Sequence, residues 1–253
     1  MAESPDSVGK TQAGFPQTQW SVVIAAGGSG SAAAEAALEK LCSIYWPPLY
    51  ATIRRHGYTP AQAEDLTQDF FAHFLQKHAA LEANPEKGRF RSLLSAMLKR
   101  FLINAWHREN SQKRGGGTLR ISLDTASVEA RYQLEGELAD MTTPESLFEQ
   151  HWAFTVLELT KGRLRQEYHE NGKAEVFDLL QETLAGRQRN TPRDELAARF
   201  GISPAAVDAA VYRLRRRYGE ILREEIARTV CEEAEVADEI RHLMAVLGRN
   251  GGN

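Results

Sequence analysis

The chain has 253 residues, of which 42% are hydrophobic and 26% charged, and its formal net charge at pH 7 is -3. Such a composition is ordinary for a water-soluble globular protein, and the length allows one large domain or two small ones. The near balance of charge excludes nucleic-acid binding by bulk positive charge, because basic segments are offset by acidic ones elsewhere.

The sequence also lacks the patterns of membrane, secreted and metal proteins. No apolar run approaches membrane-spanning length, and the N-terminus has no signal-peptide pattern. Cys42 and Cys231 have no partners at metal-ligand spacing, so we expect reduced thiols, no metal site and a cytoplasmic location. Residues 1–14 are polar and aperiodic, which predicts a flexible leader. The glycine-rich turn at 27–31 precedes no Lys-Ser or Lys-Thr pair, which disfavours a phosphate-binding loop.

The first predicted helix starts near Ser31 and ends at Gly57. Its apolar side consists of Ala37, Leu38, Leu41, Ile44 and Tyr45. Pro47 and Pro48 interrupt it, because proline lacks a backbone donor and clashes with the preceding turn.

The second predicted helix begins with Thr59 as N-cap, Pro60 in the first helical position and Gln62 three residues beyond the cap. Residues at helical spacing predict one buried stripe: Ala63, Leu66, Thr67, Phe70, Phe71, Phe74 and Leu75. The opposite face carries Asp65, Gln68, Asp69, Ala72 and Gln76. Asp65 lies in the first turn, where it favours the helix dipole, but Asp69 lies too far along for that. The acidic face is therefore either a docking surface for a basic partner or simply solvated.

The third predicted helix covers about residues 90–114. Its buried stripe consists of Phe90, Leu93, Leu94, Met97, Leu98, Phe101 and Ala105. Eight Lys or Arg and one carboxylate occur between residues 87 and 114. Off the stripe lie Lys99, Arg100, Ile103, Trp106 and His107. Cations beside flat side chains favour a nucleic-acid surface, because they meet phosphates and stack on unpaired bases. The alternative is a solvated basic face with a tryptophan at a domain seam.

Residues 115–142 are expected to form a flexible linker. Leu119, Ile121 and Leu123 alternate with polar residues, which predicts an extended segment. The rest of the linker is acidic and weakly patterned, so we expect a tether rather than a third domain.

The C-terminal part is predicted to be helical throughout. Thr143 caps a helix that ends near Gly172, and a further helix covers 173–184. A last helix is predicted from Glu232 to Leu247, with its apolar stripe packed back on the C-terminal domain. That stripe consists of Val236, Ile240, Leu243, Met244 and Leu247. A frayed tail follows at 248–253.

Between these helices lies a predicted helix-turn-helix. Thr191-Pro192 starts a short helix, Gly201 makes a tight turn and Ser203 caps a longer helix at once. The inner stripe of the longer helix is Val207, Val211, Leu214, Tyr218 and Ile221, and its outward side chains are Ala205, Ala209, Tyr212, Arg213 and Arg216. Small residues allow close approach to a groove, and longer ones reach phosphates or bases. Four arginines at 213 and 215–217 without enough local acids favour DNA binding over an ordinary helical hairpin.

Three stretches in this order resemble the extracytoplasmic-function (ECF) sigma factors of bacterial RNA polymerase: residues 64–71, 88–94 and 196–203. Phe-Pro-Gln-Thr-Gln-Trp-Ser at 15–21 is similar to the opening pattern of a longer branch of that family. The resemblance covers about residues 15–247.

The resemblance implies an all-α protein with two small helical domains on a flexible linker, no catalytic chemistry and no cofactor. Residues 15–114 would form a region-2-like domain that binds core RNA polymerase and opens the promoter -10 element. Residues 143–230 would form a region-4-like domain that reads the -35 element as duplex DNA. Residues 231–253 would add a helix and a tail.

The resemblance also implies three sets of site residues. Polymerase contact falls on Glu64, Asp65, Gln68 and Asp69. Contact with the -10 element falls on Lys87, Arg89, Arg91, Lys99, Arg100, Ile103, Trp106 and His107, with the loop 84–89 holding a flipped base. Contact with the -35 element falls on Ser203, Ala205, Ala206, Ala209, Tyr212, Arg213 and Arg216.

The chain departs from the family pattern in three places. Asp208 and Ala209 stand where many members have a basic and a hydroxyl residue, and the stretch 145–189 is longer than usual. The helix from Glu232 is extra, and it would inhibit the protein or receive a regulator such as an anti-sigma factor.

Two other function classes are open to a chain of this kind. One is a DNA-binding helix-turn-helix transcription regulator that never engages polymerase, against which the acidic face around Asp65 argues. An enzyme is disfavoured because no nucleophile-base-acid set, metal spacing or nucleotide loop is evident. His73, His78 and His107 are scattered, as surface or packing histidines are.

Overall fold

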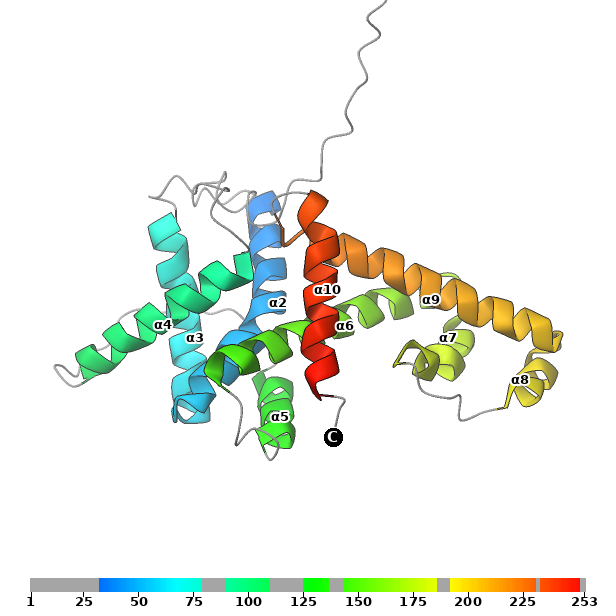
Figure 1. Cartoon of the computed structure of the whole chain (residues 1–253), viewed down its shortest axis with the longest axis horizontal. Helices are drawn as coiled ribbons and strands as arrows, with labels where there is room; N and C mark the ends of the chain where they lie inside the picture. The colour runs from blue at the N-terminus through cyan, green and yellow to red at the C-terminus, as the bar shows by residue number, and fades with distance from the viewer. Residues whose placement is uncertain are drawn as a thin grey trace, which may run out of the picture.

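The computed structural model describes residues 32–78, 90–109, 125–136, 143–185, 192–230 and 233–250. Over these ranges the chain is helical and contains no strand, which confirms the all-α prediction for this part of it (Figure 1). The helices are α2 (Ala32–Arg55), α3 (Pro60–His78), α4 (Phe90–Glu109), α5 (Thr125–Gly136), α6 (Pro144–Glu170), α7 (Ala174–Leu180), α8 (Arg193–Phe200), α9 (Pro204–Ala227) and α10 (Glu233–Asn250), with a 3-10 turn η3 at Gln181–Ala185. None of them is long and apolar enough to cross a membrane.

α2 lies at the centre of the molecule, where α3, α4, α5 and α6 all contact it. It runs unbroken through Pro47 and Pro48, which corrects the predicted interruption. Residues on several sides of this segment are buried: Leu41, Cys42, Ile44, Tyr45, Trp46, Leu49, Tyr50, Ala51 and Ile53. This packing holds the helix together where the prolines remove backbone hydrogen bonds, because tertiary context overrides local propensity.

α3 begins with the predicted cap. Gln62 donates from its backbone N to Thr59 Oγ1 at 3.4 Å, and Thr59 donates from its backbone N to Gln62 Oε1 at 3.0 Å, so two orphan donors are satisfied reciprocally. The predicted stripe is confirmed where side chains are described. Ala63, Thr67, Phe70, Phe71 and Phe74 are buried, and Leu66 is partly buried. The side chain of Leu75 lies outside the described residues.

α4 packs against α2 and α3 through most of its predicted stripe. Phe90, Leu94, Leu98, Phe101 and Ala105 are buried, and Met97 is partly buried. Leu93 is exposed, contrary to the prediction, while Leu102 is buried instead. The buried residues are spaced three or four positions apart and form one continuous stripe along α4. Leu93 lies at the edge of that stripe, where solvent reaches it.

α6 and α9 form a long antiparallel pair that joins two hydrophobic cores (Figure 1). The first core contains α2, α3 and α4 together with Trp152 of α6 and Ile226 of α9. The second contains α7 and α8 together with Leu164 of α6 and Leu214 of α9. The packing therefore differs from the predicted division at residues 114 and 143, because the first half of α6 and the end of α9 lie in the first core.

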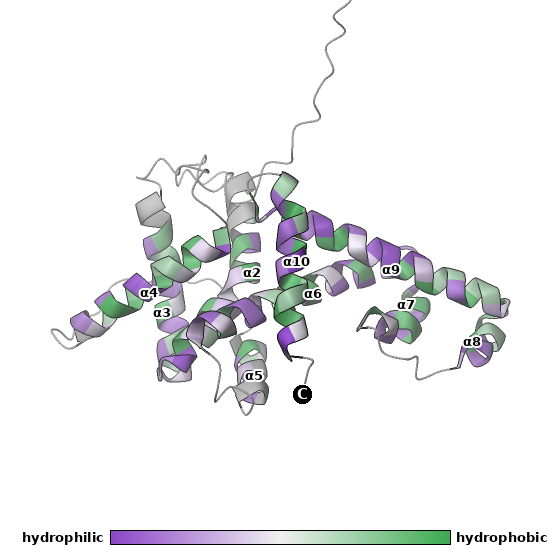
Figure 2. Ribbon diagram, viewed as in Figure 1, coloured by the Kyte–Doolittle hydropathy of each residue, from purple (hydrophilic) through white to green (hydrophobic). Residues whose placement is uncertain are grey.

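α10 packs against α6 and α9, with Leu243 and Val246 buried in the first core. Because α6 and α9 both lie within the predicted C-terminal domain, these contacts agree with the prediction that α10 packs back on it. Met244, predicted to lie in its apolar stripe, is exposed, and Val246 takes the inner position. Hydrophobic and hydrophilic residues alternate along α9 and α10 (Figure 2), as they do in helices that bury one face.

α5 occupies part of the segment that was predicted to be a flexible linker. Glu129 of α5 accepts hydrogen bonds from Tyr50 Oη at 2.6 Å and from Arg54 Nη2 at 2.9 Å, both on α2. Arg54 also lies over the Tyr132 ring, with its Cζ 5.1 Å from the centroid. A helix of 12 residues with weak amphipathicity is thus fixed on α2 by polar contacts, while its Val128 packs against the first core. Hydrophobic periodicity does not reveal the polar contacts.

Candidate functional site

The acidic face of α3 points away from the first core. Asp65 and Asp69 are exposed, and Glu64 and Gln68 are half-buried. Their side chains project from the side opposite Phe70, which the core buries completely. The face is therefore accessible to a partner, most fully at Asp65 and Asp69.

α4 exposes the five side chains that were predicted to lie off its buried stripe: Lys99, Arg100, Ile103, Trp106 and His107. Ile103 and Trp106 are 52% and 57% exposed. Leaving a large apolar side chain in water forgoes about 1.5–3 kcal/mol of burial free energy. Such an exposure beside cations indicates an interaction surface more strongly than charge alone does.

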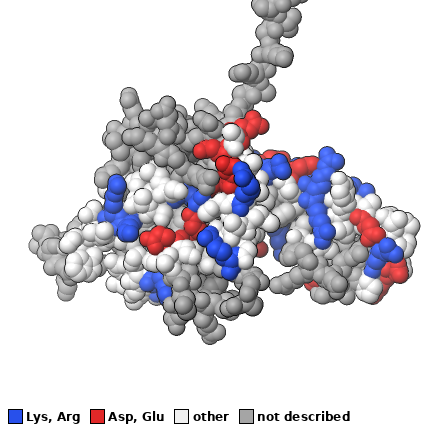
Figure 3. All heavy atoms as spheres, viewed as in Figure 1, with Lys and Arg blue, Asp and Glu red and all other residues white. Residues whose placement is uncertain are grey.

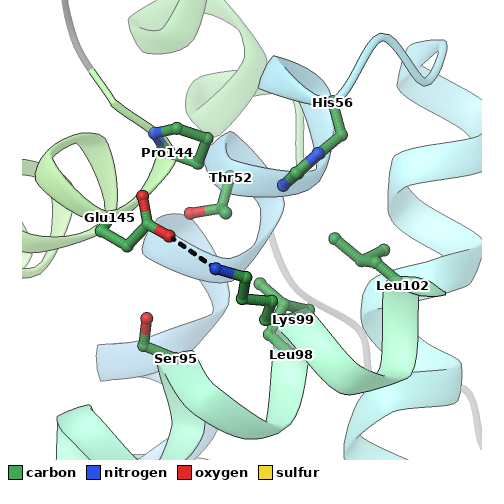
Figure 4. Close-up of a pocket in the computed structure, with 8 residues that line it drawn as sticks. All are labelled: Thr52, His56, Ser95, Leu98, Lys99, Leu102, Pro144 and Glu145. Carbon is green, nitrogen blue, oxygen red and sulfur yellow. Dashed lines mark ion pairs between the residues drawn. The ribbon is translucent and has the colours of Figure 1, made fainter.

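Lys99 lines a shallow cleft between α2, α4 and the start of α6 (Figure 4). Its Nζ lies 3.6 Å from Glu145 Oε1, and both side chains are exposed. The cleft has a volume of about 40 Å³, far below the roughly 300 Å³ of a typical ligand site. It therefore suits water rather than a small molecule, and Lys99 remains a surface cation.

Arg91 does not lie on this surface, which corrects its predicted contact with DNA. Its side chain is 5% exposed. It forms ion pairs with Glu149 of α6 and with Glu239 of α10. The loop residues Lys87 and Arg89, and the rest of 84–89, lie outside the described residues.

The turn between α8 and α9 is built as predicted. Gly201 ends α8 with φ 63°, a left-handed conformation that glycine adopts readily, and Ile202 donates from its backbone N to Ala197 O at 2.9 Å. Ser203 caps α9, because its Oγ accepts from the backbone N of Ala206 at 3.2 Å. Two helices thus meet across a three-residue connection with fixed geometry.

The outward face of α9 is accessible along its first half. Ser203, Ala205, Tyr212, Arg213 and Arg216 are exposed, and Ala206 and Ala209 are half-buried. Tyr212 is 67% exposed. The predicted inner residues Val207, Leu214 and Ile221 are buried, and Val211 and Tyr218 are partly buried.

The arginines of α9 are not equivalent, although the sequence predicted too few acids to pair them. Arg215 donates from Nη2 to Thr183 O at 2.8 Å, and Arg217 donates from Nη2 to Glu167 Oε1 at 2.7 Å. The hydrogen bond from Arg217 lowers the pKa of Glu167 despite its partial burial. Arg216 Nε lies 3.0 Å from Glu220 Oε1. Arg213 makes no ion pair within the described part of the chain, so it is the most available of the four.

Sequence reasoning missed the partner of Asp208. Its Oδ2 accepts from Arg193 Nη1 of α8 at 3.0 Å, so the carboxylate and the guanidinium bridge the two helices. The two residues are 15 positions apart, and no periodic pattern links them.

The exposed ends of α4 and of the α8–α9 pair lie at opposite ends of the long axis of the molecule (Figure 1). Basic and acidic side chains are mixed over the visible face (Figure 3). The candidate surfaces are therefore local and separated, with no continuous basic field among the described residues of this face.

A family model described as ECF sigma factor matches residues 36–224. This match includes α3, α4, α8 and almost all of α9. Comparison with curated proteins and with solved structures gave no match.

Proposed function

The chain belongs to the ECF sigma factor family, which is non-enzymatic, and on that premise we propose that it is an alternative sigma factor that binds core RNA polymerase and directs promoter recognition. Family membership implies a sigma-factor role, with RNA polymerase and promoter DNA as partners. Three surfaces of this chain, on α3, on α4 and on the α8–α9 pair, are the proposed contacts with those partners.

The acidic face of α3 is the proposed polymerase contact. Asp65 and Asp69 are exposed, and Glu64 and Gln68 flank them on the same helix. Carboxylates on a rigid helix suit a basic partner surface, because complementary charge sets the register and speeds the encounter. The burial of the opposite stripe supports this assignment, since it leaves Asp65 and Asp69 exposed on the other side of the helix.

The exposed face of α4 is the proposed contact for the -10 element. Trp106 and Ile103 offer flat or apolar surface to unpaired bases, and Lys99 and Arg100 offer charge to phosphates. The loop 84–89 remains the predicted site for a flipped base.

α8 and α9 are proposed to act as a helix-turn-helix that reads the -35 element as duplex DNA. The cap at Ser203 and the left-handed Gly201 fix the turn. The exposed Ala205 leaves room at the N-terminal end of α9, which is the end that enters the major groove in this motif. Tyr212 and Arg213 lie further along the same face and can reach the backbone or bases.

One observation carries the proposal above the others. Each of the two candidate nucleic-acid surfaces is exposed, and they lie at opposite ends of one molecule (Figure 1). Two separate promoter elements require two such surfaces, whereas a regulator that never engages polymerase requires only α8 and α9.

Run-off transcription tests the proposal. The purified chain and bacterial core RNA polymerase are combined with genomic fragments, and transcript start sites are mapped. We expect starts that depend on both components. Fragments that bind the chain but yield no chain-dependent transcript, together with no retention of core polymerase, would favour the regulator instead.

A further inference from the structure

The first two turns of α9, residues 204–211, carry one polar side chain. From Pro204 to Val211 the sequence is Pro-Ala-Ala-Val-Asp-Ala-Ala-Val, so Asp208 is the single hydrogen-bonding side chain before Tyr212. It follows Ala205 by three positions and precedes Tyr212 by four, which places it on the same helical face. Its side chain is 51% exposed. Among residues 204–211, only Asp208 can therefore recognise a base by a side-chain hydrogen bond.

A bare carboxylate is unfavourable beside DNA, because phosphates repel it. Here Arg193 of α8 supplies positive charge: its Nη1 lies 3.0 Å from Asp208 Oδ2, and its Nε lies 3.7 Å from Asp194 Oδ1, so the two carboxylates share it. Both side chains are about half exposed, and an exposed pair of this kind adds little to folding stability. Its clearer effect is on the carboxylate itself, which it orients and whose repulsion by phosphates it reduces.

An ionised carboxylate only accepts hydrogen bonds, and its two oxygens provide about four lone-pair sites. It can therefore accept from Arg193 and from a base together. In the major groove, guanine and thymine present acceptor oxygens, and adenine presents the acceptor N7 beside its N6 amino group. Cytosine presents the N4 amino donor without an adjacent acceptor, so it is the base that a carboxylate favours.

We propose that Asp208, held by Arg193, reads a cytosine in the major groove of the upstream promoter element. This inference rests on the proposed role of α8 and α9 as the duplex-reading unit. The methyl groups of Ala205 and Ala209 flank Asp208 on the outward face, where they fit thymine C5-methyl groups at neighbouring positions.

The test uses holoenzyme assembled from the full chain and core RNA polymerase. It selects bound promoters from a library in which the upstream element is randomised. Asp208→Asn keeps the shape but adds a donor, and an Asn side chain pairs with adenine N6 and N7. We expect one position to change from cytosine in the wild type to adenine in Asp208→Asn. Asp208→Ala should lose about tenfold discrimination at that position and keep the preferences elsewhere.

Asp178→Asn is the matched control, because it removes one exposed carboxylate from α7, which packs in the same second core as α8 and α9. It should raise general affinity as any lost negative charge does, with no change in base preference. Base preference is a ratio within one sample, so partial unfolding of a variant does not alter it.

The outcomes separate this inference from the proposed function. If the wild-type holoenzyme enriches no upstream element, the role proposed for α8 and α9 fails, and the reading by Asp208 fails with it. If the wild type enriches an element but the profiles of Asp208→Asn and Asp208→Ala match that of Asp178→Asn, the reading by Asp208 is overturned while the proposed function stands.

Discussion

Arg91 of α4 donates from Nε to Glu239 Oε1 of α10 at 2.5 Å, across 148 positions of sequence. Both side chains are buried, at 5% and 2% exposure. The same guanidinium reaches Glu149 of α6 and lies over the Trp152 ring, with Cζ 5.3 Å from the centroid. His242 Nε2 lies 2.8 Å from Glu149 Oε2. One arginine thus ties the basic helix to the two helices that cover the first core.

Replacement of Arg91 should therefore destabilise the fold rather than weaken a DNA contact. Arg91→Ala removes the guanidinium from the buried Glu239, and breaking a buried pair in this way costs about 3–5 kcal/mol. The free energy of unfolding, measured by urea titration, should fall by that amount.

Arg100→Ala is the matched control for Arg91, because Arg100 lies on the same helix but is exposed. Its effect should stay within about 0.5 kcal/mol. An Arg91→Ala protein that is as stable as Arg100→Ala and yet fails to open promoters would mean that Arg91 contacts DNA and has no structural role.

The arginines of α9 should separate by their partners. Arg213→Ala removes a cation that makes no ion pair in the described part of the chain. If Arg213 contacts a phosphate, the slope of log K against log salt concentration for upstream-duplex binding should become shallower by about one. The change should be the same for all DNA sequences. If it meets a base, the loss should be about 1–3 kcal/mol, with relaxed preference at one position.

Arg217→Ala provides the comparison for Arg213. Since its Nη2 lies 2.7 Å from Glu167 Oε1, we expect a lower melting temperature with little change in DNA affinity. Arg216 shares its charge with Glu220, so its replacement should have a smaller effect on affinity than that of Arg213. Equal losses of DNA affinity for Arg213→Ala and Arg217→Ala would contradict the proposal that the outward face of α9 contacts DNA through Arg213.

Trp106 should contribute to strand opening. A base that stacks on an aromatic side chain gains about 1–3 kcal/mol, so Trp106→Ala should reduce open complexes about tenfold or more on a duplex promoter. Permanganate reactivity of unpaired thymines measures the opening. A template already mismatched in its -10 region should restore it partly, because less unpairing is required.

Met244 is a matched control for Trp106, since it is a large apolar side chain at 60% exposure on α10. Met244→Ala should open promoters normally. Normal opening by Trp106→Ala as well would place base capture elsewhere, most simply in the loop 84–89.

The parts of the fold that the sequence predicts correctly are set by neighbouring residues. Thr59 with Gln62 and Ser203 with Ala206 form caps within three positions, so the local sequence alone marks both helix starts. The buried stripes follow helical periodicity in the same way. Prolines mislead the prediction at 47 and 48, because the burial that holds α2 together comes from other helices.

The parts that the sequence does not predict depend on distant partners. Arg91 lies in the first turn of the basic helix α4 and is indistinguishable by pattern from a DNA-binding arginine, since Glu239 is 148 positions away. Arg215 is similar, because its acceptor is the backbone oxygen of Thr183. α5 is weakly amphipathic, and its hydrogen bonds with Tyr50 and Arg54 join residues 79 and 75 positions apart.

The docking of α5 should depend on pH through Glu129. Partial burial raises the pKa of this carboxyl, but hydrogen bonds from Arg54, Tyr50 and Gln133 outweigh it, and the net pKa lies below the ordinary value of 4.5. A lowered folded-state pKa contributes stability that is present above 4.5 and lost as the pH falls through the folded-state value.

Glu129→Gln should isolate that contribution. The difference in melting temperature between wild type and Glu129→Gln should be largest near neutral pH and shrink as the pH falls below about 4.5. Circular dichroism from neutral pH down to about pH 3 measures it. A difference that stays constant over this range would mean that the carboxylate charge does not hold α5 on α2.

The acidic face of α3 bears most directly on whether the chain is a sigma factor that engages polymerase. Asp65→Lys with Asp69→Lys reverses two exposed charges, so helical content should stay near the wild-type value. Glu158→Lys with Glu170→Lys makes the same change in charge on exposed positions of α6 and serves as the control. Affinity for core RNA polymerase is then measured for both double variants.

We expect the Asp65/Asp69 variant to bind core RNA polymerase at least about tenfold more weakly than the wild type, because attraction becomes repulsion across the interface. The Glu158/Glu170 variant should bind normally. If the folded Asp65/Asp69 variant retains wild-type affinity, α3 is not the polymerase contact. If the wild-type chain itself shows no affinity for core polymerase, the sigma-factor function is contradicted.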